Sequence, residues 1–392
     1  IMTPVGGRLV DGLGSKKLTL WAGTITLVSA LIMAFVPNLW IFMIMRVIFS
    51  MAQGTIASIP YILAREVNPP QKLNTVFGML ATIMAVGGFI GSWLAGFLMQ
   101  QNLMSIAVAF PCLTLAMGIW LIVRNMSEDS HTRTLHMDWV GLILLSITLA
   151  CLLLALNFGP KMGWYNNWVV AGFIVGICGL LGLVYWENKM DSPLIPMSLF
   201  QQKEYVLLLA IAFTLVYYTI AMNTYLPMAV QNILKASPSI SGSLQLPKTI
   251  VLVLVPSFIG MWVARNTSNT WKALALGGLS ILISCGVLVF TGTHMPIWFI
   301  MGMVGLTGFA DAFRSVSITP AAQKLLRPQD MGIGTSMIGF FITLANTISA
   351  TVDGIAYDSL VAKTPGLVGL TQGIDTTFLL SAGVALVGIS LT

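Results

Sequence analysis

Residues 7–17 read GRLVDGLGSKK, and residues 18–36, which follow directly, read LTLWAGTITLVSALIMAFV. The first stretch holds three glycines, one acid and three cations, whereas the second carries no charge. The second also has about the 20 residues that an α-helix needs to cross the ~30 Å hydrocarbon core of a bilayer. A charged turn followed by such a run predicts a chain that turns at a membrane surface and then crosses the membrane.

The same alternation of polar connections and apolar runs continues through the 392 residues. The apolar runs are continuous rather than alternating with polar residues, which excludes a transmembrane β-barrel. We therefore expect an all-α polytopic membrane protein with twelve spans. They are expected at residues 18–36, 40–63, 73–98, 104–123, 138–157, 168–187, 206–231, 242–263, 273–291, 297–322, 332–356 and 375–392.

The composition excludes several classes of soluble protein. The chain is 57% hydrophobic and 8% charged, whereas a soluble domain carries about 25% charged residues. A cytosolic enzyme, a nucleic-acid partner and a disordered chain are therefore all disfavoured. The four cysteines (Cys112, Cys151, Cys178 and Cys285) are scattered among apolar runs, so we expect neither a disulfide framework nor a metal or cofactor site.

The cations are distributed unevenly between the connections. Thirteen lysines and arginines lie in one alternate set of loops, whereas only Lys161, Lys235 and Lys363 lie in the other set. Because cytoplasmic loops are enriched in Lys and Arg, the first set is expected to face the cytoplasm, in a multi-pass protein of the cell membrane.

Two polar linkers and an internal repeat indicate the domain organisation. The linkers 124–137 and 188–205 separate a block at residues 1–123 from a block at 206–392, with an isolated helix pair at 138–187 between them. A shift of 258 places Trp40 on Trp298, Ala64 on Ala322 and Met79 on Met337, among other matches. Two half-bundles related in this way are a common transporter plan.

The segment 7–17 resembles the loop signature G-x-L-x-D-(R/K)-x-G-(R/K)-(R/K) of the major facilitator superfamily. The matching residues are Gly7, Leu9, Asp11, Gly14, Lys16 and Lys17, while Gly12 and Ser15 depart from it. The resemblance implies a charge lock between the family's second and third helices, so that helix 1 and most of helix 2 would precede this chain. An ordinary basic loop is the alternative.

The order of further motifs resembles the 14-helix drug:proton antiporters of that superfamily. These motifs are Asp138-Trp139-x-Gly141, Gly163-Trp164, Pro193-Leu194-Ile195 and Tyr225-Leu226-Pro227. The resemblance implies a major facilitator fold with two pseudo-symmetric six-helix halves and an extra central helix pair. It also implies lipophilic small molecules, protons and the lipid bilayer as partners.

Two features of the first half fit this resemblance imperfectly. Arg46 resembles the intramembrane arginine of the family's fourth helix, which would organise a protonation network; the alternative is a side chain that snorkels to the interface. Gly87, Gly88 and Gly91 resemble the antiporter motif G-P-x-x-G-G, with Gly88 in place of the proline. Close helix packing is the alternative for these glycines.

Charged residues inside the second-half spans are the candidates for proton coupling. Asp311 and Arg314 are spaced i,i+3 and can pair on one helix face, either as a proton site or as a structural ion pair. Asp353 is expected near the outer end of its helix, more in keeping with an interfacial position than with coupling. Lys248, one turn into its helix, is expected to snorkel outward.

A substrate cavity is expected near mid-membrane. Its candidates are aromatic and amide side chains, which suit a lipophilic, weakly polar ligand: Gln53, Tyr217, Tyr218, Asn223 and Asn346. Hydrogen bonding between helices is the alternative for each of them.

The sequence therefore predicts a transporter that exports lipophilic molecules against proton influx by alternating access. An uncoupled facilitator of an endogenous lipid or metabolite is the alternative. A membrane enzyme is disfavoured because His131, His136 and His294 lie in or beside loops, away from any carboxylate in a span. A channel is disfavoured because rings of repeated charge are missing.

Overall fold

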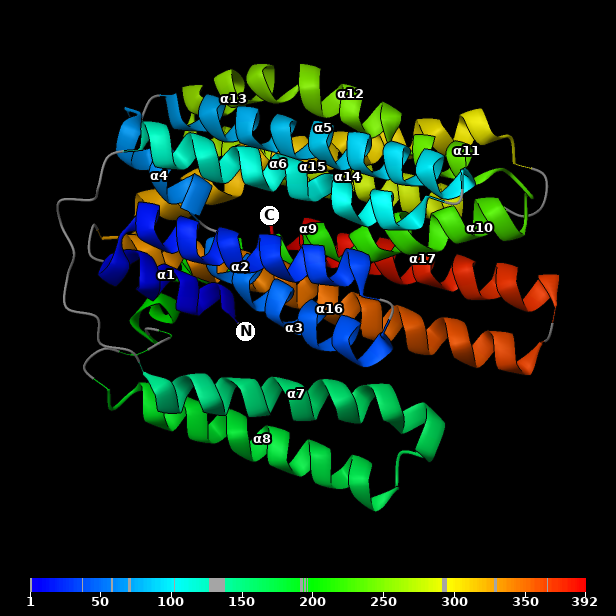
Figure 1. Cartoon of the computed structure of the whole chain (residues 1–392), viewed down its shortest axis with the longest axis horizontal. Helices are drawn as coiled ribbons and strands as arrows, with labels where there is room; N and C mark the ends of the chain where they lie inside the picture. Colours follow the sequence, from blue (N-terminus) through cyan, green and yellow to red (C-terminus); the bar gives the residue numbers. More distant parts are fainter. Residues whose placement is uncertain are drawn as a thin grey trace.

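A computed structural model describes residues 2–36, 38–57, 59–69, 72–101, 103–126, 138–190, 193, 195, 197–290, 295–327, 330–364 and 366–392. Nearly all of these residues are helical (Figure 1). The first half contains α1 (Met2–Leu13), α2 (Ser15–Phe35), α3 (Leu39–Ile56), α4 (Ile59–Val67), α5 (Leu73–Gln100) and α6 (Met104–Asn125). The central pair is α7 (Trp139–Met162) and α8 (Asn167–Glu187). The second half contains α9 (Lys203–Tyr217), α10 (Leu226–Asn232), α11 (Pro238–Ser243), α12 (Leu246–Leu254), α13 (Pro256–Arg265), α14 (Thr267–Leu288), α15 (Ile297–Leu325), α16 (Met331–Lys363) and α17 (Leu367–Ser390).

The helices match the predicted spans closely. Among the described residues, eleven segments are long and apolar enough to cross a membrane, or twelve if a bent run is counted as one span. That bent run joins Pro238–Leu254 to Pro256–Arg265 at an angle of 43°. Pro256 explains the bend because proline lacks the N–H that would continue the hydrogen-bond ladder of the preceding turn. The twelve predicted spans are therefore all found as helices.

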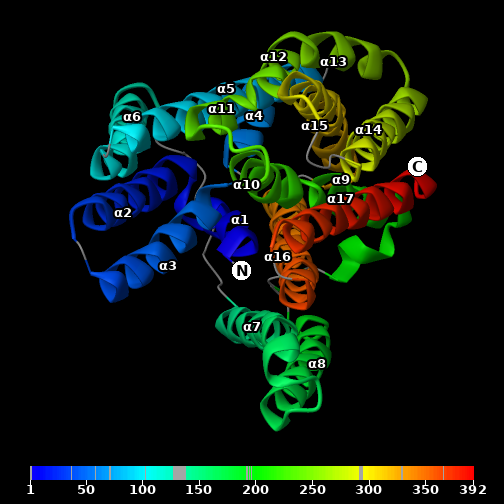
Figure 2. The ribbon, with the colours of Figure 1, turned by 90° about the vertical axis from the view of Figure 1, so that its right-hand side faces the viewer.

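The two halves pack as separate groups of helices on either side of a shared contact zone (Figure 2). In the first group, α2 packs against α3 and α6. In the second group, α15 and α17 pack on α14, and α16 packs on α17 and α9. The groups meet where α5 runs along α11, α12 and α13, and where α1 lies against α16.

The central helix pair stands apart from both halves, beside α16 (Figures 1 and 2). Its helices approach closely because α8 presents glycines to α7: a Cβ atom on Gly176 would lie 2.5 Å from Leu152, and one on Gly179 would lie 2.5 Å from Thr148. Asp138 caps α7 by accepting the backbone N–H of Gly141 and also accepts the indole N–H of Trp186. The capping aspartate therefore also joins the two helices.

The predicted glycine-rich loop at 7–17 is wrong in part, because α1 remains helical to Leu13. Only Gly14 leaves the helix, with φ of 80°, a conformation that glycine adopts without steric penalty. Burial of Val5 and Val10 against neighbouring helices favours the helical path. Lys16 and Lys17 therefore lie in the first turn of α2. The surroundings of Gly7 and the side chain of Asp11 lie outside the described residues, as do most of the linker 124–137 and all three histidines.

Candidate functional site

A carboxylate and two cations lie together in the second half. Asp311 of α15 lies with Oδ2 2.8 Å from Nζ of Lys248 on α12, and with Oδ1 3.3 Å from Nη2 of Arg314. The predicted pairing of Asp311 with Arg314 is confirmed. The expectation that Lys248 snorkels outward is wrong, because its ammonium turns into the bundle.

Glycine on α15 brings Lys248 to this position. A Cβ atom on Gly308 would lie 3.0 Å from the carbonyl oxygen of Lys248 and 2.9 Å from Cβ of Val251. Gly305, one turn earlier, faces Pro247 in the same way, at 3.1 Å. Because these glycines have no side chain, α12 can lie directly against α15. Lys248 therefore reaches Asp311, three residues after Gly308.

Tyr218 completes this arrangement. Nζ of Lys248 lies 3.3 Å from the Tyr218 hydroxyl and 5.3 Å from the centre of its ring. The hydroxyl in turn donates to the carbonyl oxygen of Thr307 at 3.5 Å. We call Lys248, Asp311, Arg314 and Tyr218 the charged cluster; with tyrosine neutral, it carries one net positive charge.

The charged cluster faces the contact zone between the halves. Thr82 of α5 donates a hydrogen bond to the carbonyl oxygen of Leu252, one helical turn after Lys248. Tyr61 of α4 packs on Phe77 of α5, the first-half helix that lies along α12 and α15. The side chains of Lys248, Asp311 and Arg314 remain 12%, 16% and 23% exposed. The cluster is therefore buried between helices of both halves yet still accessible.

A second carboxylate lies deeper in the second half. Asp353 of α16 is fully buried among the helices. Its Oδ1 lies 3.4 Å from the Tyr217 hydroxyl, and its Oδ2 lies 2.8 Å from Oγ of Ser349. In contrast to Asp311, Asp353 forms no salt bridge within the described part of the chain. Burial follows from helix packing, since α16 lies between α9 and α17.

Adjacent tyrosines connect the two carboxylates. Tyr217 contacts Asp353, whereas Tyr218 contacts Lys248. The helix is irregular here: α9 ends at Tyr217, a π-helical turn spans Ala221–Tyr225, and α10 follows. Oγ of Ser349 lies 2.7 Å from the carbonyl oxygen of Tyr217, and its single proton can be donated either there or to Asp353. Such π-turns are frequent at functional sites.

Arg46 is not part of either group. Its side chain is exposed on α3, with the guanidinium 5.5 Å from the centre of the Phe49 ring. The helix α3 contacts α2 and α1, and Arg46 forms no ion pair with any residue that the structure describes. The expected role in a protonation network therefore has no contact to support it in this conformation.

The glycines of α5 divide into two groups. A Cβ atom on Gly87, Gly88 or Gly91 would meet nothing within 4 Å, so close packing at these three positions is not observed. Close approach occurs later in the helix, where a Cβ atom on Gly96 would lie 3.2 Å from the carbonyl oxygen of Pro238. The antiporter-like glycines therefore face open space in this conformation.

The five predicted cavity residues lie in different environments in this conformation. Tyr217 and Tyr218 belong to the two carboxylate groups described above. Gln53 and Asn223 are exposed, and the Asn223 side chain accepts a hydrogen bond from Gln245 at 3.1 Å. Asn346 is half-buried, and its Oδ1 atom is buried without a hydrogen-bond partner among the described residues.

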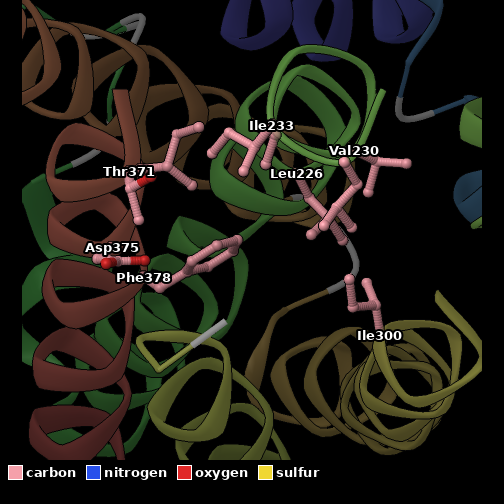
Figure 3. Close-up of a pocket in the computed structure, with 10 residues that line it drawn as sticks. Leu226, Val230, Ile233, Ile300, Thr371, Asp375 and Phe378 are labelled. Carbon is pink, nitrogen blue, oxygen red and sulfur yellow. The ribbon is translucent and has the colours of Figure 1, made fainter. Parts of the chain in front are cut away.

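A small cavity of about 10 Å³ lies between α10, α15 and α17. Figure 3 shows Phe378 of α17 pointing across it towards α10, with Asp375 beside it. The volume holds about one water molecule, so this cavity is too small for a substrate. Sequence reasoning missed Asp375, although an acid in an apolar run is the signal that singled out Asp311.

Other functional candidates also escaped sequence reasoning. Ser349 has no distinguishing motif, and the position of Tyr61 depends on how the halves meet. Gly305 and Gly308 signal a helix face near Asp311 that a neighbouring helix can approach closely, but the sequence does not tell that this neighbour carries Lys248.

Comparisons with known proteins identify relatives of this chain. The sequence model of the Major Facilitator Superfamily matches residues 1–350. Multidrug resistance protein 3 of Bacillus subtilis (strain 168) is 22% identical over 90% of this chain, and Multidrug transporter protein MdtP of the same organism is 23% identical over 90%. Probable multidrug resistance protein EmrY of Escherichia coli (strain K12) is 22% identical over 90%. The chain spans 68%, 65% and 69% of the lengths of these three relatives.

Solved structures share the fold. The human organic anion transporter MFSD10 (TETRAN) aligns with a TM-score of 0.67 at 14% identity, covering 99% of this chain and 79% of that one. An auto-inhibited POT family peptide transporter aligns with a TM-score of 0.65 at 14% identity, covering 100% and 85%.

Proposed function

The chain belongs to the major facilitator superfamily, and from this premise we propose that it is a proton-coupled exporter of lipophilic small molecules. It is a multi-pass membrane transporter, not an enzyme. Export of lipophilic compounds is supported by the multidrug resistance and transport proteins that it resembles at 22–23% identity. The proposed location is the cell membrane, with the more basic loops in the cytoplasm.

The observation that carries proton coupling is that Asp353 is buried and forms no ion pair with any cation that the structure describes. A charged side chain inside a bundle is strongly disfavoured unless it is paired, and a carboxylate can remove the charge by binding a proton. Asp353 is fully buried and has hydrogen-bonding neighbours, Ser349 and Tyr217, that can orient it in either protonation state. We therefore assign the transported proton to Asp353.

Asp311, the other predicted proton site, is in a different environment. Its protonation would break contacts with both Lys248 and Arg314 and leave two cations in the bundle without an anion. We therefore place Asp311 in substrate binding. Tyr217 and Tyr218 are consecutive residues of one helix, so a movement of that helix would affect both carboxylates together.

Alternating access would proceed by rocking of the two halves about the charged cluster. In the present conformation the halves are joined by Arg65 of α4, whose Nη1 donates to the carbonyl oxygen of Gln323 on α15 at 2.6 Å. This contact would break in the opposite conformation.

The test uses the full-length protein in proteoliposomes that contain a pH-sensitive dye. Gradients of three molecules with the same fluorophore are imposed in turn: dansylglycine (anionic), dansylglycinamide (neutral) and dansylcadaverine (cationic). Proton counterflow with at least one of them, above that of protein-free liposomes and lost in Asp353→Asn, supports the proposal. Movement of a dansyl compound without proton counterflow would instead support the alternative, an uncoupled facilitator. That alternative is favoured by Gly88, which replaces the proline of the antiporter motif.

A further inference from the structure

We propose that the charged cluster is a binding site for the anionic group of an amphipathic molecule with a single negative charge. The inference deepens the proposed function and depends on it only for the claim that the bound molecule is transported. Binding itself rests on the charges, contacts and exposure of four residues: Lys248, Asp311, Arg314 and Tyr218.

The first argument is charge balance. Lys248 and Arg314 share one carboxylate, Asp311. Removing charges from water is expensive unless each finds a counter-charge, so an uncompensated cation between helices is destabilising. A monoanion would make the cluster neutral, whereas a monocation would leave it with two excess positive charges.

The second argument is the unused hydrogen-bonding capacity of Arg314. Its Nε atom is buried without a hydrogen-bond partner in the described chain. Its one contact to Asp311, at 3.3 Å, is longer than the ~2.7–2.9 Å of a strong charge-assisted bond. A guanidinium presents its donors as a planar fork that suits carboxylate or sulfonate oxygens. An anion that engaged this fork would satisfy the Nε donor, which the described residues leave unpaired.

The third argument is the position of apolar and aromatic groups beside the cations. Tyr218 lies under Lys248, and Tyr61 of α4 lies beside α5, the first-half helix that runs along α12 and α15. Tyr61 packs edge to face on Phe77 at 5.5 Å, and its hydroxyl lies 3.7 Å from the sulfur of Met84. This aromatic and thioether surface would hold the apolar body of a ligand whose charged end lies at Lys248 and Arg314.

A cationic ligand fits the same residues poorly. It would bind at Asp311 and would have to displace Lys248, whose Nζ atom lies 2.8 Å from the carboxylate. The displaced ammonium would then lack a counter-charge, and the bound cation would have to share Asp311 with Arg314. The geometry therefore favours an anion that competes with Asp311 for the two cations.

The experiment measures binding of the three dansyl compounds by fluorescence, with the full-length protein in nanodiscs of phosphatidylcholine. We expect dansylglycine to bind about tenfold or more tightly than dansylglycinamide, and dansylcadaverine to bind most weakly. Lys248→Gln and Arg314→Gln should each weaken dansylglycine binding about tenfold, with little change for dansylglycinamide. Lys248→Arg should retain most of the affinity for dansylglycine.

Asp311→Asn is the matched variant, for which we expect the affinity for dansylglycine to change in the opposite direction. It removes the competing carboxylate, so it should strengthen dansylglycine binding, a result that general damage to the fold would not produce. Equal binding of the three compounds, preference for dansylcadaverine, or no saturable binding of dansylglycine by folded protein would each overturn the proposal. Weaker dansylglycine binding by Asp311→Asn would also overturn it.

The source of the anion is distinguished by adding phosphatidylglycerol to the nanodiscs. Competition with dansylglycine would identify an anionic lipid headgroup as an occupant, and its absence would identify a water-borne organic anion; both results support the anion site. Failure of the proposed function is separate, because it would appear as dansylglycine binding without proton counterflow in the proteoliposomes.

Discussion

Arg65 donates a hydrogen bond to Gln323 at 2.6 Å, and these two residues are separated by 258 positions, the same shift that relates Ala64 to Ala322 in the internal repeat. Each half therefore contributes the equivalent position to a contact between the halves. The contact between these equivalent positions indicates that the pseudo-symmetry axis relating the two halves passes close to Arg65 and Gln323. It also identifies Arg65 as a contact that stabilises one arrangement of the halves.

Replacement of Arg65 by glutamine should shift the population towards the opposite conformation. A hydrogen bond from a charged group contributes about 1.5–3 kcal/mol, which corresponds to a roughly tenfold to hundredfold change in the equilibrium. Distances between spin labels placed at Lys72 and Lys324, on the two halves, would report the change. Lys272→Gln is the control because it removes an exposed cation of α14 that forms no ion pair with any residue that the structure describes. An unchanged distance distribution in Arg65→Gln would contradict this assignment.

Asp353→Asn should abolish proton counterflow while leaving binding of dansylglycine within about twofold of the wild type. The amide keeps the shape of the side chain and can still hydrogen-bond Ser349 and Tyr217, but it cannot exchange a proton. The matched control is Asp358→Asn, because Asp358 lies on the same helix and is exposed. Proton counterflow would be followed with the enclosed dye. If Asp358→Asn were as damaging as Asp353→Asn, burial would not be the relevant property.

The spans could be predicted from sequence because long apolar runs have few alternative structures in a membrane. The turn at 7–17 was only partly predictable: its glycines suggested a loop, but tertiary packing of Val5 and Val10 kept all except Gly14 helical. The pairing of Asp311 with Arg314 follows from spacing along one helix. The directions of Lys248 and Asp353 could not be obtained in this way, because they depend on which helix lies opposite.

Gly308→Ala should separate Lys248 from Asp311. The added methyl group would lie 2.9 Å from Cβ of Val251 and 3.0 Å from the carbonyl oxygen of Lys248, so α12 would have to move. Overpacking of this kind costs about 1–3 kcal/mol, and dansylglycine binding should weaken as the cluster opens. Gly302→Ala is the control on the same helix, since its methyl group would meet nothing within 4 Å. Thermal unfolding in detergent and dansylglycine titration would measure both effects; equal behaviour of the two variants would refute the packing argument.

Tyr205→Phe should lower stability without affecting transport directly. The Tyr205 hydroxyl is buried and donates to the carbonyl oxygen of Gly334 at 2.7 Å, joining α9 to α16. The carbonyl of Gly334 still accepts the backbone N–H four residues later in α16, so the loss is that of one additional hydrogen bond, about 0.5–1.5 kcal/mol. Tyr165→Phe, at a residue that is 95% exposed, should leave the unfolding transition unchanged. Unfolding in detergent would compare them, and a stability of Tyr205→Phe equal to that of Tyr165→Phe would show that the hydrogen bond contributes nothing.

Gly78→Ala and Gly91→Ala should separate two roles for the glycines of α5. A methyl group on Gly78 would lie 2.9 Å from Cβ of Pro256, so this substitution should destabilise the contact between the halves by about 1–3 kcal/mol. A methyl group on Gly91 would meet nothing within 4 Å, so stability should be unchanged within about 0.5 kcal/mol. Thermal unfolding and dansylglycine transport would be measured for both variants. Loss of transport by a fully stable Gly91→Ala would mean that α5 packs more closely around Gly91 in the opposite conformation, whereas wild-type transport would assign the antiporter-like glycines no role in the cycle.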